Sequence, residues 1–305
     1  MNLLMLSACV IGSDKYARPR DLAPAWLVDR TRVLAVVAEP PEVRPGETAT
    51  FSVLLAGPPG DPLDLAVLWL ACPVDDEGNG FGCATDLGSL DLGATMTPEQ
   101  LEELGVIGFE PGLPPSYTVP DDLLDGLAPE DRLEGSYVLV QVTAFPLDAL
   151  DQPVDDIDYS TVEAAYKRLI VSEAATPNHN PLIDSGAVDG ATLPLGALVH
   201  LDADQVYEIS VALRDASRER YDFVTGDGLT EQRVEEPYVS WFVAGTDEDG
   251  SGDPGGELLE SVTLWPYLDA TWLSPAEPGA SGTWFAVLRD RRGGMTWWRQ
   301  DWVVD

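Results

Sequence analysis

Short runs of apolar residues, several of them alternating with polar residues, recur along the chain from residue 32 onward. Such runs predict β-strands. In the first half of the chain they cover residues 33–37, 48–55, 65–70, 137–145 and 166–171. In the second half they cover residues 198–201, 206–213, 239–244, 259–265, 283–289 and 295–303. Glycine, proline and aspartate separate the runs, as they do in turns. Short strands between such turns predict an all-β sandwich or barrel.

Residues 84–134 interrupt the strand pattern. Thr97 can cap a short helix, Pro98 suits its first position, Gln100 completes a capping box, and Gly105 ends it. Residues 120–127 predict a further helical turn. We therefore expect a partly helical insertion between strands of the first half.

The chain contains an internal repeat. Two segments align without gaps, and each holds a strand with a central tryptophan followed by an acidic, glycine-rich turn: residues 67–80 with Trp69, and residues 239–252 with Trp241. Gly135 and Gly282 also correspond, because an aromatic residue (Tyr137 or Trp284) follows each by two positions, ahead of a strand. Immunoglobulin-like domains place a tryptophan in the middle of the sandwich and an aromatic residue near the start of a later strand.

A duplicated unit explains this repeat, so the sequence predicts two tandem immunoglobulin-like β-sandwiches. We place the first at residues 28–175, with the insertion at 84–134, and the second at residues 182–305. Between them, residues 176–181 contain two prolines, two asparagines and no apolar residue, which predicts a linker. Residues 1–9 are interpreted as the remnant of a lipoprotein signal and residues 10–27 as a tether.

The N-terminus carries the signal for this interpretation. An apolar run at residues 3–6 leads into Leu6-Ser7-Ala8-Cys9, which resembles the bacterial lipobox, where the cysteine is lipidated and the preceding residues are removed. The run is short and no Lys or Arg precedes it, so either the start codon is placed too late or Cys9 is a stray cysteine in a tail. No later run approaches the roughly 20 apolar residues that span a bilayer, so membrane attachment depends on Cys9.

Two further cysteines, Cys72 and Cys83, enclose a short segment rich in glycine and aspartate. An oxidising compartment would pair them in a disulfide, which contributes roughly 3 kcal/mol for a loop of this size in the chain-entropy model. The alternative is two buried free thiols. No second cysteine or histidine pair accompanies them, so zinc is not indicated.

The formal net charge is -36, from 53 acidic against 17 basic residues. Phosphate backbones would be repelled by such a chain, which argues against nucleic acid as a partner. Anionic membrane surfaces are disfavoured for the same reason.

The acidic turn of the second repeat is a candidate calcium site. Asp247, Asp249 and Asp253 have the spacing of a calcium loop, and the glycines between them let backbone carbonyls turn inward. It is not an EF-hand, because Leu258 stands where the bidentate glutamate belongs. The alternative is a solvated hairpin turn, which Asp and Gly form readily. The first-repeat counterpart, with Asp75, Asp76 and Glu77, is a poorer calcium loop.

Tryptophan is concentrated in the second half, where seven of the nine occur: Trp241, Trp265, Trp272, Trp284, Trp297, Trp298 and Trp302. Trp297 and Trp298 are adjacent, so in a strand they point to opposite faces. Unless another element covers it, one of them is exposed and could stack on a sugar ring or anchor a partner. The alternative assigns most of the tryptophans to the core.

The chain resembles envelope lipoproteins of myxobacteria and neighbouring bacterial groups. The resemblance rests on Leu6-Ser-Ala-Cys9, residues 34–41, Pro45-Gly-Glu-Thr48, residues 235–242, and residues 288–294 ahead of Trp297. It covers most of the chain, and its motifs are mostly structural. It implies a cell-envelope location, at the outer membrane, and immunoglobulin-like modules, and it implies no activity.

Catalytic motifs are missing from the sequence. His179 lies in the linker and His200 in a strand near Asp202 and Asp204, and neither has a nucleophile motif around it. We therefore expect a lipid-anchored, non-catalytic protein that acts through contacts with envelope proteins. The alternative is a carbohydrate-binding or glycan-active protein that uses exposed tryptophans and carboxylates, which a cleft with an exposed tryptophan and two carboxylates would favour. A third possibility is a subunit of a larger envelope assembly.

Overall fold

The computed structural model describes residues 24–59, 64–73, 100–101, 104–109, 113–151, 158, 161–194, 196–225, 229–246 and 255–305. Several predicted site residues lie outside these ranges: Cys9, Cys83, Asp75, Asp76, Glu77, Asp247, Asp249 and Asp253. Lipidation, the Cys72–Cys83 disulfide and calcium binding therefore stay predictions.

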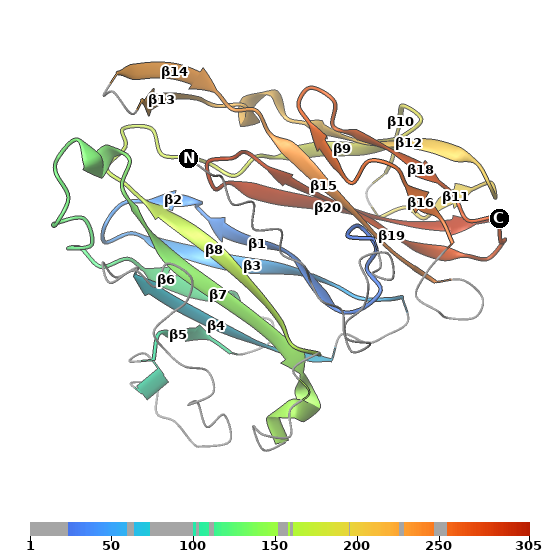
Figure 1. Ribbon diagram of the computed structural model, residues 1–305, viewed down its shortest axis with the longest axis horizontal. Coiled ribbons are helices and arrows are strands. Elements are labelled where there is room, and N and C mark those ends of the chain that lie inside the picture. The colour runs from blue at the N-terminus through green and yellow to red at the C-terminus, as the bar shows by residue number, and fades with distance from the viewer. Residues whose placement is uncertain are drawn as a thin grey trace, which may run out of the picture.

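The first sandwich consists of a three-stranded and a five-stranded sheet (Figure 1). The three-stranded sheet has the order β1 (Arg32–Glu39), β3 (Thr48–Ala56), β6 (Ser116–Thr118). The five-stranded sheet has the order β2 (Glu42–Val43), β8 (Glu163–Val171), β7 (Ser136–Pro146), β4 (Leu65–Pro73), β5 (Val106–Gly108). Trp69 and Phe51 meet between the sheets, with ring centroids 6.2 Å apart.

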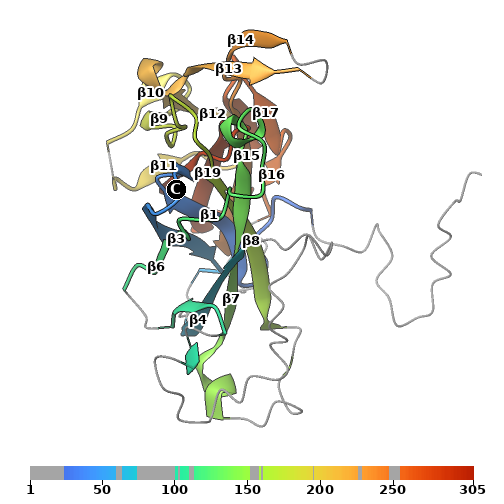
Figure 2. The same cartoon turned by 90° about the vertical axis from the view of Figure 1, so that its left-hand side faces the viewer.

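The second sandwich consists of two five-stranded sheets. One has the order β10 (Ala191–Thr192), β9 (Ile183–Val188), β12 (Val206–Leu213), β18 (Asp269–Leu273), β16 (Glu257–Leu258). The other has the order β11 (Val199–Leu201), β20 (Met295–Val304), β19 (Ser281–Arg289), β15 (Tyr238–Thr246), β17 (Val262–Leu264). A separate hairpin of β13 (Arg220–Val224) and β14 (Thr230–Val234) projects from this sandwich, at the top of Figures 1 and 2.

The two sandwiches repeat one sheet topology. In one sheet of each sandwich, a short edge strand pairs in parallel with its neighbour: β2 with β8, and β11 with β20. The other strand pairs in these two sheets are antiparallel. Trp69 lies opposite Val142 on β7, and Trp241 lies opposite Ala286 on β19. Both tryptophans are buried, each in the core of its own sandwich. The prediction of two tandem immunoglobulin-like β-sandwiches is confirmed.

The predicted correspondence of Tyr137 with Trp284 is shifted in the structure. Because Trp69 and Trp241 are equivalent, their cross-strand partners Val142 and Ala286 are equivalent too. Trp284 therefore corresponds to Val140, and both are fully buried. Tyr137 lies nearer the start of its strand and is partly exposed, with the guanidinium of Arg168 4.8 Å from its ring centroid.

The partly helical insertion is not supported. Within 84–134, the described residues form β5 and β6, turns that include residues 121–126, two helical positions at Gln100 and Leu101, and one 3-10 turn, Asp131–Leu133. β5 pairs with β4 and β6 pairs with β3, so each strand forms the edge of a different sheet. Each is only three residues long, too short to show an alternating pattern in the sequence.

Tryptophans dominate the core of the second sandwich. Ring centroids lie 5.7 Å apart for Trp272 and Trp302, 6.1 Å for Trp284 and Trp302, and 6.4 Å for Trp241 and Trp298. The indole N–H of Trp241 donates to Thr263 Oγ1 at 3.1 Å. Among the described residues, the indole N–H groups of Trp272, Trp284 and Trp302 have no hydrogen-bond partner. The expected core role is thus observed for most of the tryptophans.

A third apolar layer joins the two sandwiches. The face of β1 and β3 that points away from its own core packs on the outer face of the β15–β19–β20 sheet. The layer contains Val28, Leu34, Ala35, Leu54, Ala56, Ala244, Phe285 and Val287, with Phe242, Met295 and Trp297 partly buried at its margin. Both sheets are therefore apolar on two faces, which explains the nearly continuous apolar runs of β1 and β19.

The N-terminal segment packs on the second sandwich, and its Val28 belongs to the apolar layer. Val28 donates a backbone hydrogen bond to Val243 O, and the Val243 amide donates to Trp26 O. The Trp26 ring contacts Trp272 edge-on at 6.1 Å. The predicted tether therefore does not extend to residue 27, since residues 26 and 27 pack on the second sandwich before the chain enters the first. No helix in the described part of the chain is long and apolar enough to span a membrane.

Candidate functional site

The tryptophan pair predicted as a binding site lies on β20, with its two rings on opposite faces. Trp298 points into the core of the second sandwich and is 9% exposed. Trp297 points the other way and packs on the apolar layer between the sandwiches. The first sandwich covers part of the Trp297 side chain, which is half-buried. Both tryptophans therefore pack against other apolar residues, as in the alternative that assigns most of the tryptophans to the core.

The predicted linker is held on both sides. The side-chain amide of Asn180 donates to Ala38 O and to Glu39 Oε2, each at 2.7 Å, and its oxygen accepts from the Met295 amide at 2.8 Å. Asn178 is 1% exposed and donates to Asp290 Oδ2 at 2.8 Å. The two asparagines thus bridge β1 of the first sandwich and the β19–β20 turn of the second.

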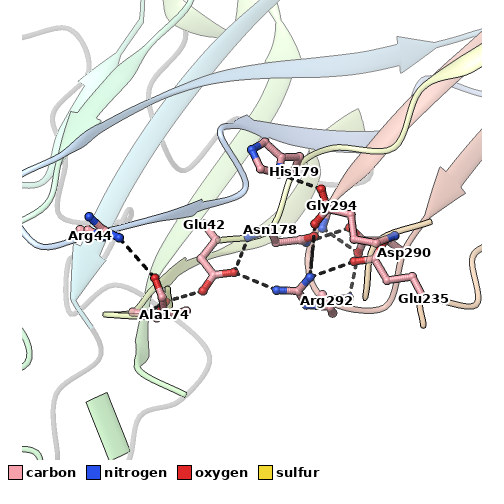
Figure 3. Close-up of polar contacts among 11 residues, drawn as sticks. Glu42, Arg44, Ala174, Asn178, His179, Glu235, Asp290, Arg292 and Gly294 are labelled. Carbon is pink, nitrogen blue, oxygen red and sulfur yellow. Dashed lines mark hydrogen bonds and ion pairs between the residues drawn. The ribbon is translucent and has the colours of Figure 1, made fainter. Parts of the chain in front are cut away.

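Arg292 forms the centre of a buried polar network at this junction (Figure 3). Its guanidinium lies 3.0 Å from Glu235 Oε1, 3.4 Å from Glu219 Oε2 and 3.4 Å from Glu42 Oε2. It also donates to Asn178 Oδ1 at 3.3 Å. Glu42 comes from the first sandwich and Arg292 from the second, so the ion pair connects the two domains directly.

Each buried carboxylate in the network has further donors. Glu42 accepts from the Asn178 amide at 2.7 Å and from the Ser172 hydroxyl. Glu235 accepts from the Glu219 amide at 3.2 Å. A buried charge is tolerated when its remaining lone pairs are satisfied in this way.

The β19–β20 turn, which contains Arg292, is held in its conformation by Asp290 and by two glycines. Asp290 is 1% exposed and accepts from the amides of Arg292 at 2.7 Å and Gly294 at 2.9 Å. A Cβ at Gly294 would lie 2.0 Å from Asp290 Oδ2, so only glycine fits there. Arg291 has φ 71° and Gly293 φ 109°, which fold the turn back on Asp290. Lys167 of β8 donates to Gly293 O across the junction.

Burial shifts two pKa values at the junction. Desolvation raises the pKa of Glu235 to about 7; Asp290 adds to the rise, and Arg292 and the Glu219 amide oppose it. Desolvation lowers the pKa of Lys167 to about 8, with Asp290 opposing and Arg289 adding to the decrease. Strongly shifted groups mark catalytic sites when they line a cleft. Glu235 is 2% exposed and Lys167 6%, and both are hydrogen-bonded, so this network is suited to holding two domains together.

The two histidines have different carboxylate partners, and His179 reaches the Arg292 network through Glu219. His179 Nδ1 lies 2.8 Å from Glu219 Oε1, and His200 Nδ1 lies 2.8 Å from Asp305 Oδ1. Both imidazoles are mostly exposed. In the part of the chain that the structure describes, no group of three or more metal-ligating side chains occurs.

A shallow cavity of about 340 Å³ lies beside β12 and β18. Glu208 and Ser210 of β12 and Asp269 of β18 share one face of the sheet, since Ser210 and Asp269 are cross-strand partners. Trp265 also lines the cavity, and the guanidinium of Arg218 lies 4.3 Å from its ring centroid. The arrangement that the sequence associated with glycans has an exposed tryptophan beside two carboxylates; here two carboxylates lie beside an indole that is partly buried.

No protein-family model and no curated protein matches the sequence. Solved structures with a similar fold include a nucleoside hydrolase-related hypothetical protein from Saccharophagus degradans, at 16% identity and a TM-score of 0.30, over 45% of this chain and 28% of that chain. The Ig1-2 module of the Drosophila receptor protein tyrosine phosphatase DLAR is 12% identical, with a TM-score of 0.26 over 90% of this chain and 99% of that one. The Yersinia pseudotuberculosis adhesin InvE is 11% identical, with a TM-score of 0.24 over 88% and 58%. Likenesses this distant carry no argument about function.

Few features of the sequence indicate the junction. Arg292 and Glu42 are 250 positions apart, and the residues around each give no reason to expect a buried charge. The available signal was the pair of asparagines between prolines at 177–181, because asparagines there can fix backbone groups on both sides. The run Arg289-Asp-Arg-Arg-Gly-Gly294 was a second signal, since its two glycines mark a tight turn.

Proposed function

We propose that this chain is a lipid-anchored protein of the bacterial cell envelope with a non-catalytic binding role, acting through protein–protein contacts. The observation that carries the proposal is the junction, where an apolar layer and the Arg292 network fix the two sandwiches to each other. A unit that is already ordered loses little conformational entropy when a partner binds. Two sandwiches joined in this way present one continuous, preformed surface.

The envelope location is supported by the lipobox-like Leu6-Ser7-Ala8-Cys9. It is tested by expressing the natural gene in a bacterial host and measuring the mass of the mature protein. We expect a chain that begins at Cys9 with lipid attached and fractionates with membranes. A Cys9→Ser variant should lack the lipid mass. An unlipidated wild-type chain with an intact N-terminus would contradict the anchor.

The binding role is tested by chemical cross-linking of native envelopes followed by mass spectrometry. We expect reproducible cross-links to a small set of envelope proteins. An unrelated lipoprotein of equal abundance serves as the control for crowding at the membrane. If the chain gives no cross-links beyond those of the control, the proposed protein–protein role is wrong.

A second candidate is carbohydrate binding at the cavity lined by Trp265, Glu208 and Asp269. An indole face stacks on a sugar ring, and carboxylates accept hydrogen bonds from its hydroxyls. A glycan array with the purified chain tests it. We expect retained glycans to be lost in Trp265→Ala and kept in Trp297→Ala, and an array without any retained glycan would remove this candidate.

A further inference from the structure

The outer face of the β15–β19–β20 sheet is only partly covered by the first sandwich. Leu264 of β17, Tyr238 of β15 and Arg289 of β19 are cross-strand partners and form one row across this face. Val262 lies on the same side of β17, opposite Ser240. Together with Arg291, these residues (Val262, Leu264, Tyr238, Arg289 and Arg291) are named the β17 strip.

The β17 strip continues the apolar layer between the sandwiches. Phe242 lies two residues beyond Ser240 on the same face of β15 and packs in that layer. Arg289 marks the boundary, since its guanidinium donates to Ser240 Oγ at 2.9 Å and to Leu34 O of the first sandwich at 3.4 Å. Past this boundary Val262 is 56% exposed and Leu264 52%. Exposed apolar side chains that extend a buried layer indicate a contact surface.

Within the described part of the chain, the positive charges of the strip have no acidic ion-pair partner. Among the described residues, no carboxylate oxygen lies within ion-pair distance of Arg289 or Arg291. Both guanidinium groups lie near the Tyr238 ring instead, 5.8 and 6.0 Å from its centroid. In a chain with 53 acidic and 17 basic residues, two guanidinium groups that have no carboxylate partner among the described residues can attract a carboxylate of another molecule. Tyrosine and arginine beside apolar residues are also the composition of binding hot spots.

The spacing along the row indicates what kind of segment fits. Leu264 and Arg289 are two strand spacings apart, which is about 9.6 Å at about 4.8 Å per strand. A polyproline II segment rises about 3.1 Å per residue with three residues per turn, so residues i and i+3 share a face about 9.3 Å apart. In a β-strand, residues i and i+3 point to opposite faces.

We propose that the β17 strip binds an extended, proline-containing acidic segment of a partner protein, with an apolar side chain on Val262 and Leu264 and a carboxylate three positions later on Arg289 and Arg291. This inference rests on the proposed protein–protein role and names the partner's chemistry. A second copy of the chain is the less suitable occupant, because two chains of net charge -36 repel each other.

The test uses three synthetic peptides and the full chain labelled with 15N. The probe is Pro-Leu-Pro-Pro-Glu-Pro, and the controls replace its glutamate by lysine or its leucine by serine. We expect the probe to shift the amide signals of Leu264, Tyr238 and their neighbours, and to bind at least about tenfold tighter than either control. The affinity should fall as salt is added, because a carboxylate–guanidinium contact is screened.

Two variants and two matched controls locate the contact. Leu264→Ser and Arg291→Glu should each weaken probe binding at least about tenfold. Leu198→Ser changes a leucine of equal exposure, 52%, elsewhere on the second sandwich. Arg299→Glu makes the same charge change on the exposed part of β20. Both controls should leave the affinity within about twofold of the wild-type value.

The proposal is overturned if the probe does not bind at millimolar concentration, if its shifts map outside the strip, or if both strip variants bind as the wild type does. It is equally overturned if sedimentation shows a dimer that Leu264→Ser dissociates, because the occupant would then be a second copy. Any of these results leaves the envelope cross-linking result intact, so failure of the strip and failure of the binding role are distinguishable.

Discussion

At the scale of single residues, the guanidinium of Arg292 connects the two domains through several carboxylates. Arg292 is shared by Glu42, Glu219 and Glu235, and the Tyr221 ring centroid lies 4.5 Å from its guanidinium carbon. Removing one member of a buried ion pair costs more than the pair contributes, because the other charge is left without compensation.

We therefore expect Arg292→Met to lower the free energy of unfolding by about 3–5 kcal/mol, since buried Glu235 and Glu42 lose their cation. Arg299→Met is the matched control, because Arg299 is an exposed arginine of β20, the strand that follows the Arg292 turn; its effect should stay within about 0.5 kcal/mol. Urea unfolding followed by tryptophan fluorescence measures both. Equal effects of the two substitutions would show that the network contributes no stability.

Glu235 predicts a pH dependence at the same scale. Its folded-state pKa of about 7 lies above the ordinary value of 4.5, so the folded chain holds this proton more tightly than the unfolded chain does. The resulting stabilisation is fully present below pH 4.5 and is lost as the pH rises through 7. Glu235→Gln should remove this component, so that the unfolding free energy falls less steeply between pH 4.5 and 7 than in the wild type. Asp184→Asn, at an exposed pair with Arg214, is the control. Identical slopes in wild type and Glu235→Gln would contradict the shifted pKa.

At the scale of elements, the second sandwich closes by bringing β9 against β20. Gly186 of β9 lies under the Trp298 indole, and a Cβ there would come 2.1 Å from the ring. The glycine allows the tryptophan to fill the space between the two sheets, so its position is set by packing across the sandwich.

We expect Gly186→Ala to destabilise the chain by about 1–3 kcal/mol, because the added methyl group overpacks a filled core. Gly126→Ala is the control, since nothing lies within 4 Å of a Cβ there. Thermal melting compares the two. A melting temperature of Gly186→Ala equal to that of the control would mean that the Trp298 indole can move aside at no cost.

At the scale of the whole molecule, the apolar layer makes the two sandwiches one unit. Leu34 and Leu54 of the first sandwich pack with Phe285 and Val287 of the second. Burying each such side chain contributes about 1.5–3 kcal/mol, so the layer couples the unfolding of the two domains.

Calorimetry should therefore show one cooperative transition for the wild type and two for Leu54→Asp, which places a charge in the layer. Leu198→Asp is the control, because that leucine is 52% exposed and should keep the single transition. Two resolved transitions in the wild type would mean that the sandwiches unfold independently, and the rigid-unit argument for the proposed function would fail with them.

The sequence by itself determined the fold class and most of the long strands. Alternation of apolar and polar residues is a local property, so β1, β3, β7, β12, β15, β19 and β20 were recognisable from the residues that form them. The duplicated tryptophan segment was enough to predict two sandwiches, because Trp69 and Trp241 occupy equivalent buried positions. Three-residue strands such as β5 and β6 carry too few residues for a period, so the sequence predicts only a partly helical insertion over the segment 84–134 that contains them.

Only the tertiary structure decided which element packs on the outer face of each sheet. Trp297 could be assigned to a sheet face from the sequence, yet only the fold shows that the first sandwich partly buries it. Arg292 and Glu42 meet across 250 positions, and no local pattern encodes a contact between residues so far apart. Local periodicity fixes which way a side chain points, whereas the neighbour that it meets is fixed by how distant elements pack.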